Sequence, residues 1–178
     1  GDYVKVNFNS DDVSYITEIL DRKNYIVRRA SNLSKLAHIL AANIDQVLLF
    51  VTVSSPETTT VFIDRFLITA EAYRVPVCLV FNKIDIYDEV DLEYVDALIN
   101  LYRTIGYQCV KTSLTKKIGV AKLKEVIKDK VTLLARHSGV GKSLFINVAT
   151  NREQRKVGDI STYHQRGRHT TTFSEMIE

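Results

Sequence analysis

Two short stretches of this 178-residue sequence carry residues that could hold a nucleotide. Residues 135–148 read ARHSGVGKSLFINV, and residues 80–85 read VFNKID. Apart from its first glycine, the first stretch matches the pattern G-x-x-x-x-G-K-[ST], in which backbone N–H groups bind phosphates between a strand and a helix. The second stretch ends on a carboxylate, which can accept hydrogen bonds from a base. Together they predict a single site for a phosphorylated guanosine.

The phosphate loop is the stronger of the two motifs. Its glycines let the backbone turn inward, and the helix that follows adds partial positive charge at its N-terminus. Lys142 would reach the β- and γ-phosphates, and Ser143 would bind magnesium. Arg136 replaces the first glycine of the pattern, whereas the two glycines nearest the phosphates are present. A Gly-Lys-Ser helix start without a ligand is the alternative. The predicted nucleotide contacts in this loop are Ser138, Gly139, Val140, Gly141, Lys142, Ser143 and Leu144.

The NKID motif predicts recognition of guanine. Asp85 would accept the two N–H groups on one edge of guanine, which adenine cannot supply, so GTP is favoured over ATP. Asn82 would contact the other edge of the ring, and the stem of Lys83 would cover its face. A plain turn ending in Asp is the alternative. In KTSL, residues 111–114, Ser113 and the N–H of Leu114 could support the guanine carbonyl, although an ordinary strand end explains that stretch almost as well.

Alternating strands and helices are predicted to position these loops. Continuous apolar runs such as QVLLFVTVS and VPVCLVFN are typical of strands buried on both faces. Apolar residues at helical spacing indicate helices over residues 57–74, from Asp88 to Tyr102, and around residues 120–127. Shorter strands are expected within YQCVKTS, KVTLLA and the first 30 residues. The alternation predicts an α/β fold with a parallel-rich sheet and helices on both of its faces.

Composition and charge exclude several classes of protein. The chain is 46% hydrophobic with a net charge of +3, which suits a folded domain and identifies no partner. Cys78 and Cys109 match no metal-binding spacing and are expected to be buried thiols. The apolar runs are too short for a membrane span. Residues 22–35 contain five basic residues and no acidic one. This cluster could bind phosphates or form a solvated surface, and its members are Arg22, Lys23, Arg28, Arg29 and Lys35.

The order of the motifs is rotated relative to ordinary small GTPases, because NKID precedes the phosphate loop. The sequence therefore resembles a circularly permuted GTPase. The segments RKNYIVRRASN, HILAANIDQVLLFVTV, RFLITAEAYRVPVCLVFNKID, HSGVGKS and VGDIS…GRHTTT resemble the RsgA (YjeQ) family of ribosome small-subunit-dependent GTPases, almost from end to end.

The resemblance implies a GTPase that acts in late maturation of the small ribosomal subunit and is stimulated by that subunit. It implies GTP or GDP and Mg2+ as ligands, the small subunit and its rRNA as partners, and a cytoplasmic location. We expect a monomer with no membrane association. An rRNA-binding assembly factor that uses GTP as a structural ligand, with negligible hydrolysis, is the alternative function.

The family's domain order also gives expectations for this chain. Residues 1–35 are expected to be the C-terminal remnant of an OB-fold barrel plus a linker. Residues 36–178 are expected to be the permuted GTPase domain, with its C-terminal part incomplete. Zinc is expected only in a C-terminal domain absent from this chain. The OB fold raises the expectation that the basic residues between Arg22 and Lys35 contact RNA.

The GRHTTT segment would be the switch that senses the γ-phosphate. By resemblance, Thr171 is the favoured second magnesium ligand, with Thr170 and Thr172 as close alternatives. A polar loop whose hydroxyls face water is the other interpretation. His169 could orient the attacking water, or simply be exposed, and Lys142 is the other candidate catalytic residue. Arg168 could stabilise phosphate charge or contact rRNA. The predicted switch residues are Gly167, Arg168, Thr170, Thr171 and Thr172.

Overall fold

The structure is a computed structural model that describes residues 1–8, 14–29, 37–136, 139–150 and 176. Its centre is a parallel four-stranded sheet in the order β7-β6-β5-β8. The strands are β5 (Gln46–Val51), β6 (Val77–Phe81), β7 (Gln108–Lys111) and β8 (Thr132–Arg136). Every residue of β5 and β6 is buried, as their continuous apolar runs predict.

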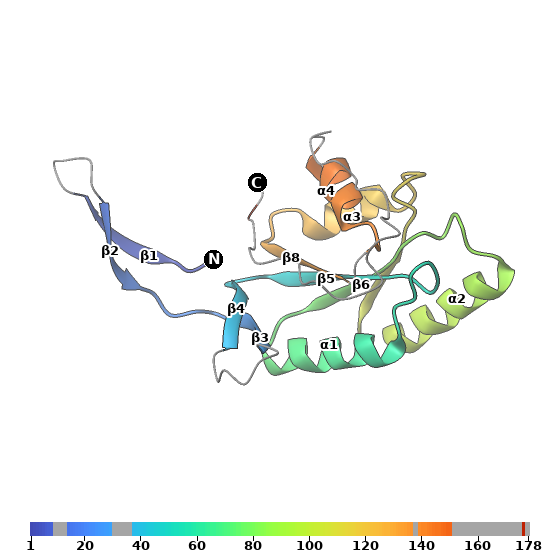
Figure 1. Cartoon of the computed structure of the whole chain (residues 1–178), viewed down its shortest axis with the longest axis horizontal. Helices are drawn as coiled ribbons and strands as arrows, with labels where there is room; N and C mark the ends of the chain where they lie inside the picture. Colours follow the sequence, from blue (N-terminus) through green and yellow to red (C-terminus); the bar gives the residue numbers. More distant parts are fainter. Residues whose placement is uncertain (9–13, 30–36, 137–138, 151–175, 177–178) are drawn as a thin grey trace, which may run out of the picture.

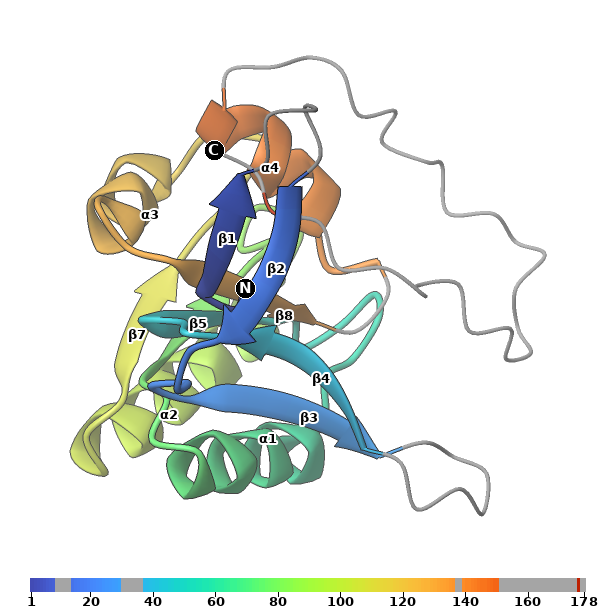
Figure 2. The ribbon, with the colours of Figure 1, turned by 90° about the vertical axis from the view of Figure 1, so that its left-hand side faces the viewer.

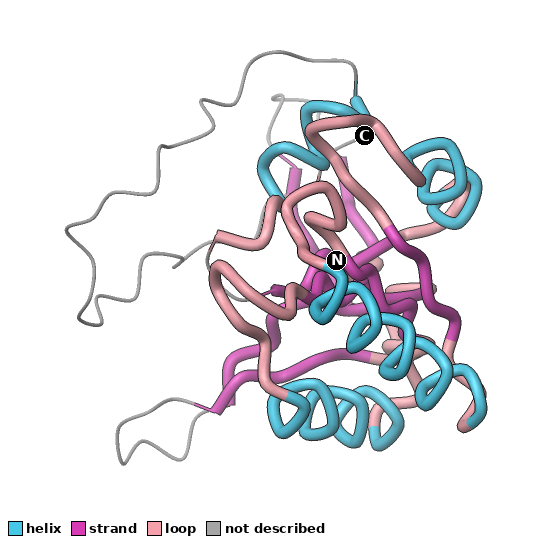
Figure 3. The backbone as a smooth tube through the Cα atoms, turned by 90° about the vertical axis from the view of Figure 1, so that its right-hand side faces the viewer, coloured by secondary structure: helices cyan, strands magenta, loops and turns pink. Residues whose placement is uncertain are grey.

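Helices cover both faces of this sheet. Helices α1 (Thr60–Ala72) and α2 (Glu89–Thr104) lie on one face, and α3 (Val120–Ile127) and α4 (Lys142–Thr150) lie on the other (Figure 1). The tube in Figure 3 shows the same three layers from the side. The order of strands and helices along the chain and their arrangement in layers confirm the predicted α/β class, with a parallel sheet and helices on both faces.

The alternation of side chains along the strands divides the core in two. Val47 and Leu49 of β5 pack with Ile63 and Leu67 of α1 on the first face. On the second face, Phe50 packs against Phe145 of α4, with 5.4 Å between the ring centroids. Burial on both faces explains why the central strands carry almost no polar side chains.

Helices α1 and α2 begin at capping side chains. The Thr59 hydroxyl accepts a hydrogen bond from the N–H of Phe62, so α1 begins three residues later than its apolar pattern predicts. Asp88 caps α2 by accepting from the N–H of Asp91 at 2.8 Å. The other predicted helix starts and strands agree with the structure to within a few residues.

Two antiparallel ribbons precede the sheet. One pairs β1 (Val4–Phe8) with β2 (Ser14–Ile19), and the other pairs β3 (Tyr25–Arg29) with β4 (Ala37–Ala42). All residues of β1 and β2 are exposed, and this ribbon extends away from the sheet (Figure 1). The second ribbon packs on α1 through Tyr25 and Tyr73, whose ring centroids are 5.1 Å apart.

Strand β4 bears on the predicted domain division. It lies C-terminal to the boundary expected at residue 35, yet its only strand partner among the described residues is β3, on the other side of that boundary. The division into residues 1–35 and 36–178 thus stays a prediction. None of the helices in the described part of the chain is both long enough and apolar enough to cross a membrane.

Candidate guanine-nucleotide site

The predicted nucleotide loops all follow the carboxyl ends of parallel strands. NKID follows β6, Ser113 follows β7, and the glycine loop follows β8. A further loop, residues 52–59, follows β5. Since parallel strands point the same way, these four loops meet at one rim of the sheet, which is where ligands of open α/β sheets bind.

The side chain of Asn82 joins three of these loops. Its Nδ2 donates to the carbonyl of Val140 at 2.8 Å, across 58 residues of sequence. Its Oδ1 accepts from the Thr112 hydroxyl at 3.1 Å and from the N–H of Leu114 at 3.3 Å. Asn82 is only 3% exposed. The NKID motif and the phosphate loop are therefore in direct contact despite their distance along the chain.

This arrangement adds a role that the sequence analysis did not include. We predicted that Asn82 and the N–H of Leu114 face the guanine, whereas the structure has both engaged with each other. One N–H of the Asn82 amide has no protein acceptor among the described residues. The predicted base contacts of both residues stay predictions.

The phosphate loop has the backbone that its glycines allow. Gly139 and Gly141 adopt φ values of 83° and 104°, in the region that side chains avoid. A Cβ atom on Gly141 would lie 2.6 Å from Nδ2 of Asn82. The carbonyl of Gly141 accepts from the N–H of Phe145 at 2.9 Å, which starts α4. The loop therefore curls tightly against NKID and leads directly into a helix N-terminus, as phosphate binding requires.

Not all predicted residues of the phosphate loop are described. Val140 is fully buried, and Leu144 packs against the second core cluster. Lys142 and Ser143 form the first turn of α4, but only their backbone is described. Ser138 lies outside the described residues.

Asp85 is an exposed carboxylate supported by hydroxyl groups. Its Oδ2 accepts from the Thr115 hydroxyl at 3.0 Å, and the hydroxyls of Thr115 and Ser113 are also 3.0 Å apart. Hydrogen bonding by Ser113 and then by Thr115, aided by the charge of Lys116, lowers the pKa of Asp85. The carboxylate therefore stays ionised at neutral pH, which is the state that accepts two N–H groups from guanine.

Lys83 and Tyr87 tie the loop after β5 to the base loops. Lys83 has a φ of 71° and donates from Nζ to the carbonyl of Ser55, and its partial burial lowers its pKa. Tyr87 donates to the Asn82 carbonyl at 2.7 Å and accepts from the N–H of Val53 at 3.2 Å. The motifs did not reveal Thr112, Thr115 or Tyr87 as site residues. Only their nearness to NKID and KTSL could have suggested them.

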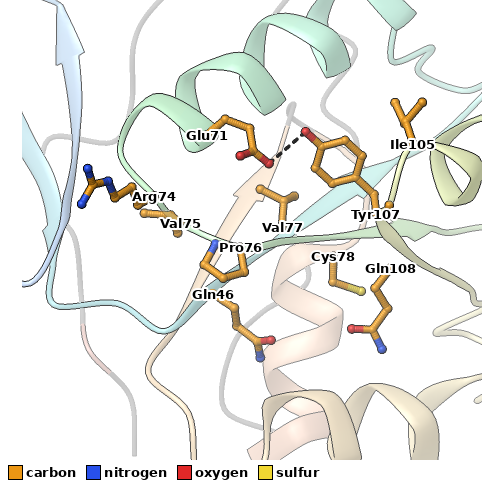
Figure 4. Close-up of a pocket in the computed structure, with 11 residues that line it drawn as sticks. Gln46, Glu71, Arg74, Val75, Pro76, Val77, Cys78, Ile105, Tyr107 and Gln108 are labelled. Atoms are coloured by element: carbon orange, nitrogen blue, oxygen red, sulfur yellow. Dashed lines mark hydrogen bonds between the residues drawn. The ribbon is translucent and has the colours of Figure 1, made fainter.

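A hollow of about 410 Å³ lies at the opposite rim, beside the amino ends of β6 and β7 (Figure 4). Its lining includes Gln46, Arg74 and Gln108, and the Tyr107 hydroxyl donates to Glu71 at 3.2 Å. None of the predicted nucleotide residues lines it. The loops predicted to bind the phosphates and the base meet instead at the carboxyl rim.

The remaining predicted residues differ in how far the structure describes them. Arg22 forms a bidentate ion pair with Asp2, and Lys23 pairs with Asp45 at 2.9 Å. Only the backbone of Arg28 and Arg29 is described. The following residues lie outside the described part of the chain: Lys35, Gly167, Arg168, His169, Thr170, Thr171 and Thr172. Where side chains are described, no group of three or more His, Cys, Asp or Glu could hold a metal ion.

The parallel sheet, the glycine loop after β8 and the NKID loop after β6 define a circularly permuted GTPase fold. Solved structures agree. The chain is similar to YjeQ from Thermotoga maritima, with a TM-score of 0.70 and 40% identity over 84% of this chain and 50% of that one. It is also similar to YloQ, described as a circularly permuted GTPase, with a TM-score of 0.64 and 31% identity over 85% of this chain and 50% of that one.

Sequence comparison then identifies the family. The model of the family described as RsgA GTPase matches residues 19–178, so the chain belongs to the RsgA GTPase family. It is 60% identical to the small ribosomal subunit biogenesis GTPase RsgA of Phocaeicola vulgatus, and 59% identical to RsgA 2 of Bacteroides thetaiotaomicron. In each case the alignment covers 99% of this chain and 57% of the relative. The chain thus spans little more than half the length of these curated relatives.

Proposed function

We propose that this protein is a GTPase that acts in late maturation of the small ribosomal subunit and hydrolyses GTP when the subunit stimulates it. The observation that carries the proposal is the hydrogen bond from Asn82 to the Val140 carbonyl. This bond joins the predicted base-binding loop to the predicted phosphate-binding loop on one rim, where one nucleotide could contact both. The names of the relatives support the small subunit as the partner.

The proposed roles follow from the chemistry of each group. The backbone N–H groups around Gly139 and Gly141 would bind the phosphates, and Lys142 would neutralise the β- and γ-oxygens. Asp85 would select guanine. Ser143 and Thr171 would hold magnesium through hydroxyl oxygens, a donor type that magnesium prefers, and the ion would neutralise phosphate charge. His169 would orient the attacking water.

The same proposal extends to location and domain organisation. A factor that matures ribosomal subunits in a bacterium works in the cytoplasm, where the subunits are. Residues 1–35 would belong to an OB-type barrel. The exposed apolar side chains of the first ribbon, such as Phe8 at 78% and Ile16 at 66%, support this assignment, because a lone ribbon cannot bury them.

The test measures nucleotide binding and hydrolysis, with and without purified small subunits. We expect GTP and GDP to bind in preference to ATP, and subunits to accelerate hydrolysis. Lys142→Ala should abolish hydrolysis, and Asp85→Asn should weaken GTP binding by at least about tenfold, since a paired charged acceptor is worth roughly 1.5–3 kcal/mol. If Asp85→Asn kept full preference for GTP, the base assignment would be wrong. If Lys142→Ala bound no nucleotide yet still supported subunit maturation, a nonenzymatic assembly factor would replace the GTPase.

A further inference from the structure

Positive charge is concentrated on one side of the sheet. Residues 111–130, which cover α3 and its flanking loops, contain seven lysines and two acidic residues, a net charge of +5. Residues 57–104, which cover α1 and α2, contain nine acidic and four basic residues, a net charge of −5. The two halves of the fold therefore present opposite charges to an approaching polyanion.

Five of these lysines lie on α3 or in the loops that flank it, and we call this set the lysine face. They are Lys116, Lys117, Lys122, Lys124 and Lys128. All are exposed except Lys124, which is half-buried, and no carboxylate of the described residues forms an ion pair with any of them. By contrast, Lys111 pairs with Asp96 at 2.5 Å. Within the described part of the chain, ion pairs therefore leave the charge of the lysine face without neutralisation.

The fold holds this face outward. Helix α3 buries Val120, Leu123 and Val126 against the sheet, so its apolar side is already in use. Figure 2 shows α3 at the margin of the molecule, near edge strand β7. A helix that inserts into a membrane surface needs a free apolar side, which α3 lacks. Lysine ammonium groups on a rigid support are instead suited to phosphates, which they bind as point charges.

The lysine face adjoins the candidate guanine site. The backbone N–H of Lys116 donates to the Ser113 hydroxyl at 3.1 Å, and the charge of Lys116 contributes to the lowered pKa of Asp85. A phosphate bound at Lys116 and Lys117 would therefore rest on the loop that supports the base-binding carboxylate. Arg22 and Lys23, predicted from sequence to contact RNA, are already paired with carboxylates.

We propose that the lysine face is a docking surface for the phosphate backbone of RNA. The inference rests on the proposed function for the presence of an RNA partner, and it names the side of the domain that meets that partner. The acidic α1–α2 layer would orient the domain by turning away from the same RNA. An acidic protein is the competing partner class.

The experiment compares two variants of the chain, each lacking two positive charges. Lys122→Gln with Lys128→Gln removes charge from the lysine face, while Arg65→Gln with Arg74→Gln removes charge from exposed positions of the α1 side. Binding to a short RNA duplex and to purified small subunits is measured over a range of salt concentrations. The first pair should weaken RNA binding about tenfold and lower the slope of log affinity against log salt by about 2. The control pair should leave both unchanged.

Nucleotide binding is measured in parallel with a fluorescent GDP analogue, so that the two proposals fail separately. Normal GDP binding with equal loss of RNA affinity in both pairs would overturn the docking surface alone. Loss of GDP binding in the unchanged chain would overturn the proposed function, whatever the RNA result. If polyglutamate bound more tightly than the RNA duplex and depended on Lys122 and Lys128, the partner would be an acidic protein and the RNA assignment would be wrong.

Discussion

Asn82 shows how a single amide can make one site from separate loops. We expect Asn82→Ala to remove three side-chain hydrogen bonds and to leave the buried Val140 carbonyl without its partner among the described residues. Losses of this kind cost about 1 kcal/mol each, so the free energy of unfolding should fall by roughly 2–4 kcal/mol. Guanine-nucleotide affinity should also fall, because the NKID loop and the glycine loop lose the hydrogen bond that joins them.

Urea unfolding and nucleotide titration measure the two effects of Asn82→Ala. Asn100→Ala is the control, since Asn100 is exposed on α2, away from the rim. A variant at Asn82 that unfolded like the unchanged protein and bound nucleotide normally would contradict the role given to this amide.

Comparing Gly141 with Gly106 distinguishes two effects of adding a side chain, namely backbone strain and a clash with a neighbouring residue. Gly141 and Gly106 have nearly equal φ values, 104° and 101°, but a Cβ would strike Asn82 only at Gly141, while nothing lies within 4 Å at Gly106. Either Gly→Ala change should cost about 1–3 kcal/mol of stability through strain. Only Gly141→Ala should also abolish nucleotide binding. Equal nucleotide affinity in the two variants would show that the contact with Asn82 does not matter for binding.

Burial in β6 and β7 makes two cysteine thiols harder to ionise. Burial raises the pKa of Cys78 in β6 to about 12 and that of Cys109 in β7 to about 11. In the unfolded chain a thiol ionises near pH 8.5, so above that pH the unfolded state binds fewer protons than the folded state. The free energy of unfolding should therefore have its full value below about pH 8. It should fall as the pH rises from about 9 toward 12, by up to about 1.4 kcal/mol per pH unit for each thiol.

Chemical denaturation between pH 7 and 10 measures this dependence. The Cys78→Ala variant should lose part of the decline with pH, although the cavity it creates lowers stability at every pH. Native Cys78 should also resist alkylation until the chain unfolds. Rapid alkylation of the folded protein would contradict the burial of β6.

The sheet and its helices could be predicted from the sequence, whereas β4 could not. Strands such as β5 and β6 carry unbroken apolar runs. The NKID motif marks the end of β6, and the glycine loop marks the end of β8. Strand β4 reads AHILAA, which lacks alternation and is rich in alanine, a residue that does not favour strands. Its pairing with β3 is a tertiary effect that local patterns do not encode.

The residues of the candidate site also fall into those that the sequence predicts and those that it does not. Motif residues such as Asp85 and Gly141 were predicted because their chemistry depends on residue type and spacing. Thr115 and Tyr87 were missed because a threonine or tyrosine acquires its role only from the partner that folding provides. The contact between Asn82 and Val140 likewise depends on the three-dimensional meeting of two loops, although each loop was recognised separately.

The chain as a whole contains regions of very different burial, which should appear in amide hydrogen exchange. Every residue of β1 and β2 is exposed, and a two-stranded ribbon alone is marginally stable. In the isolated 178-residue chain these strands should exchange with opening free energies near zero, while β5 and β6 should exchange only through global unfolding. Protection of β1–β2 equal to that of β6 would mean that another part of the chain covers the ribbon.

The sheet order also has a consequence for how the protein is made. Strand β5 lies between β6 and β8, and about 80 residues separate the end of β5 from the start of β8. During translation, β6 begins about 25 residues after the end of β5, whereas β8 begins about 80 residues after it, so the strand that leads into NKID can pair with β5 first. From the emergence of β5 until that of β8, which takes several seconds at roughly 5–20 residues per second, the other flank of β5 lacks its neighbour β8. A nascent chain in this interval presents an apolar strand edge on which a foreign strand could pair, and the arrival of β8 closes that edge as it brings the glycine loop to the rim.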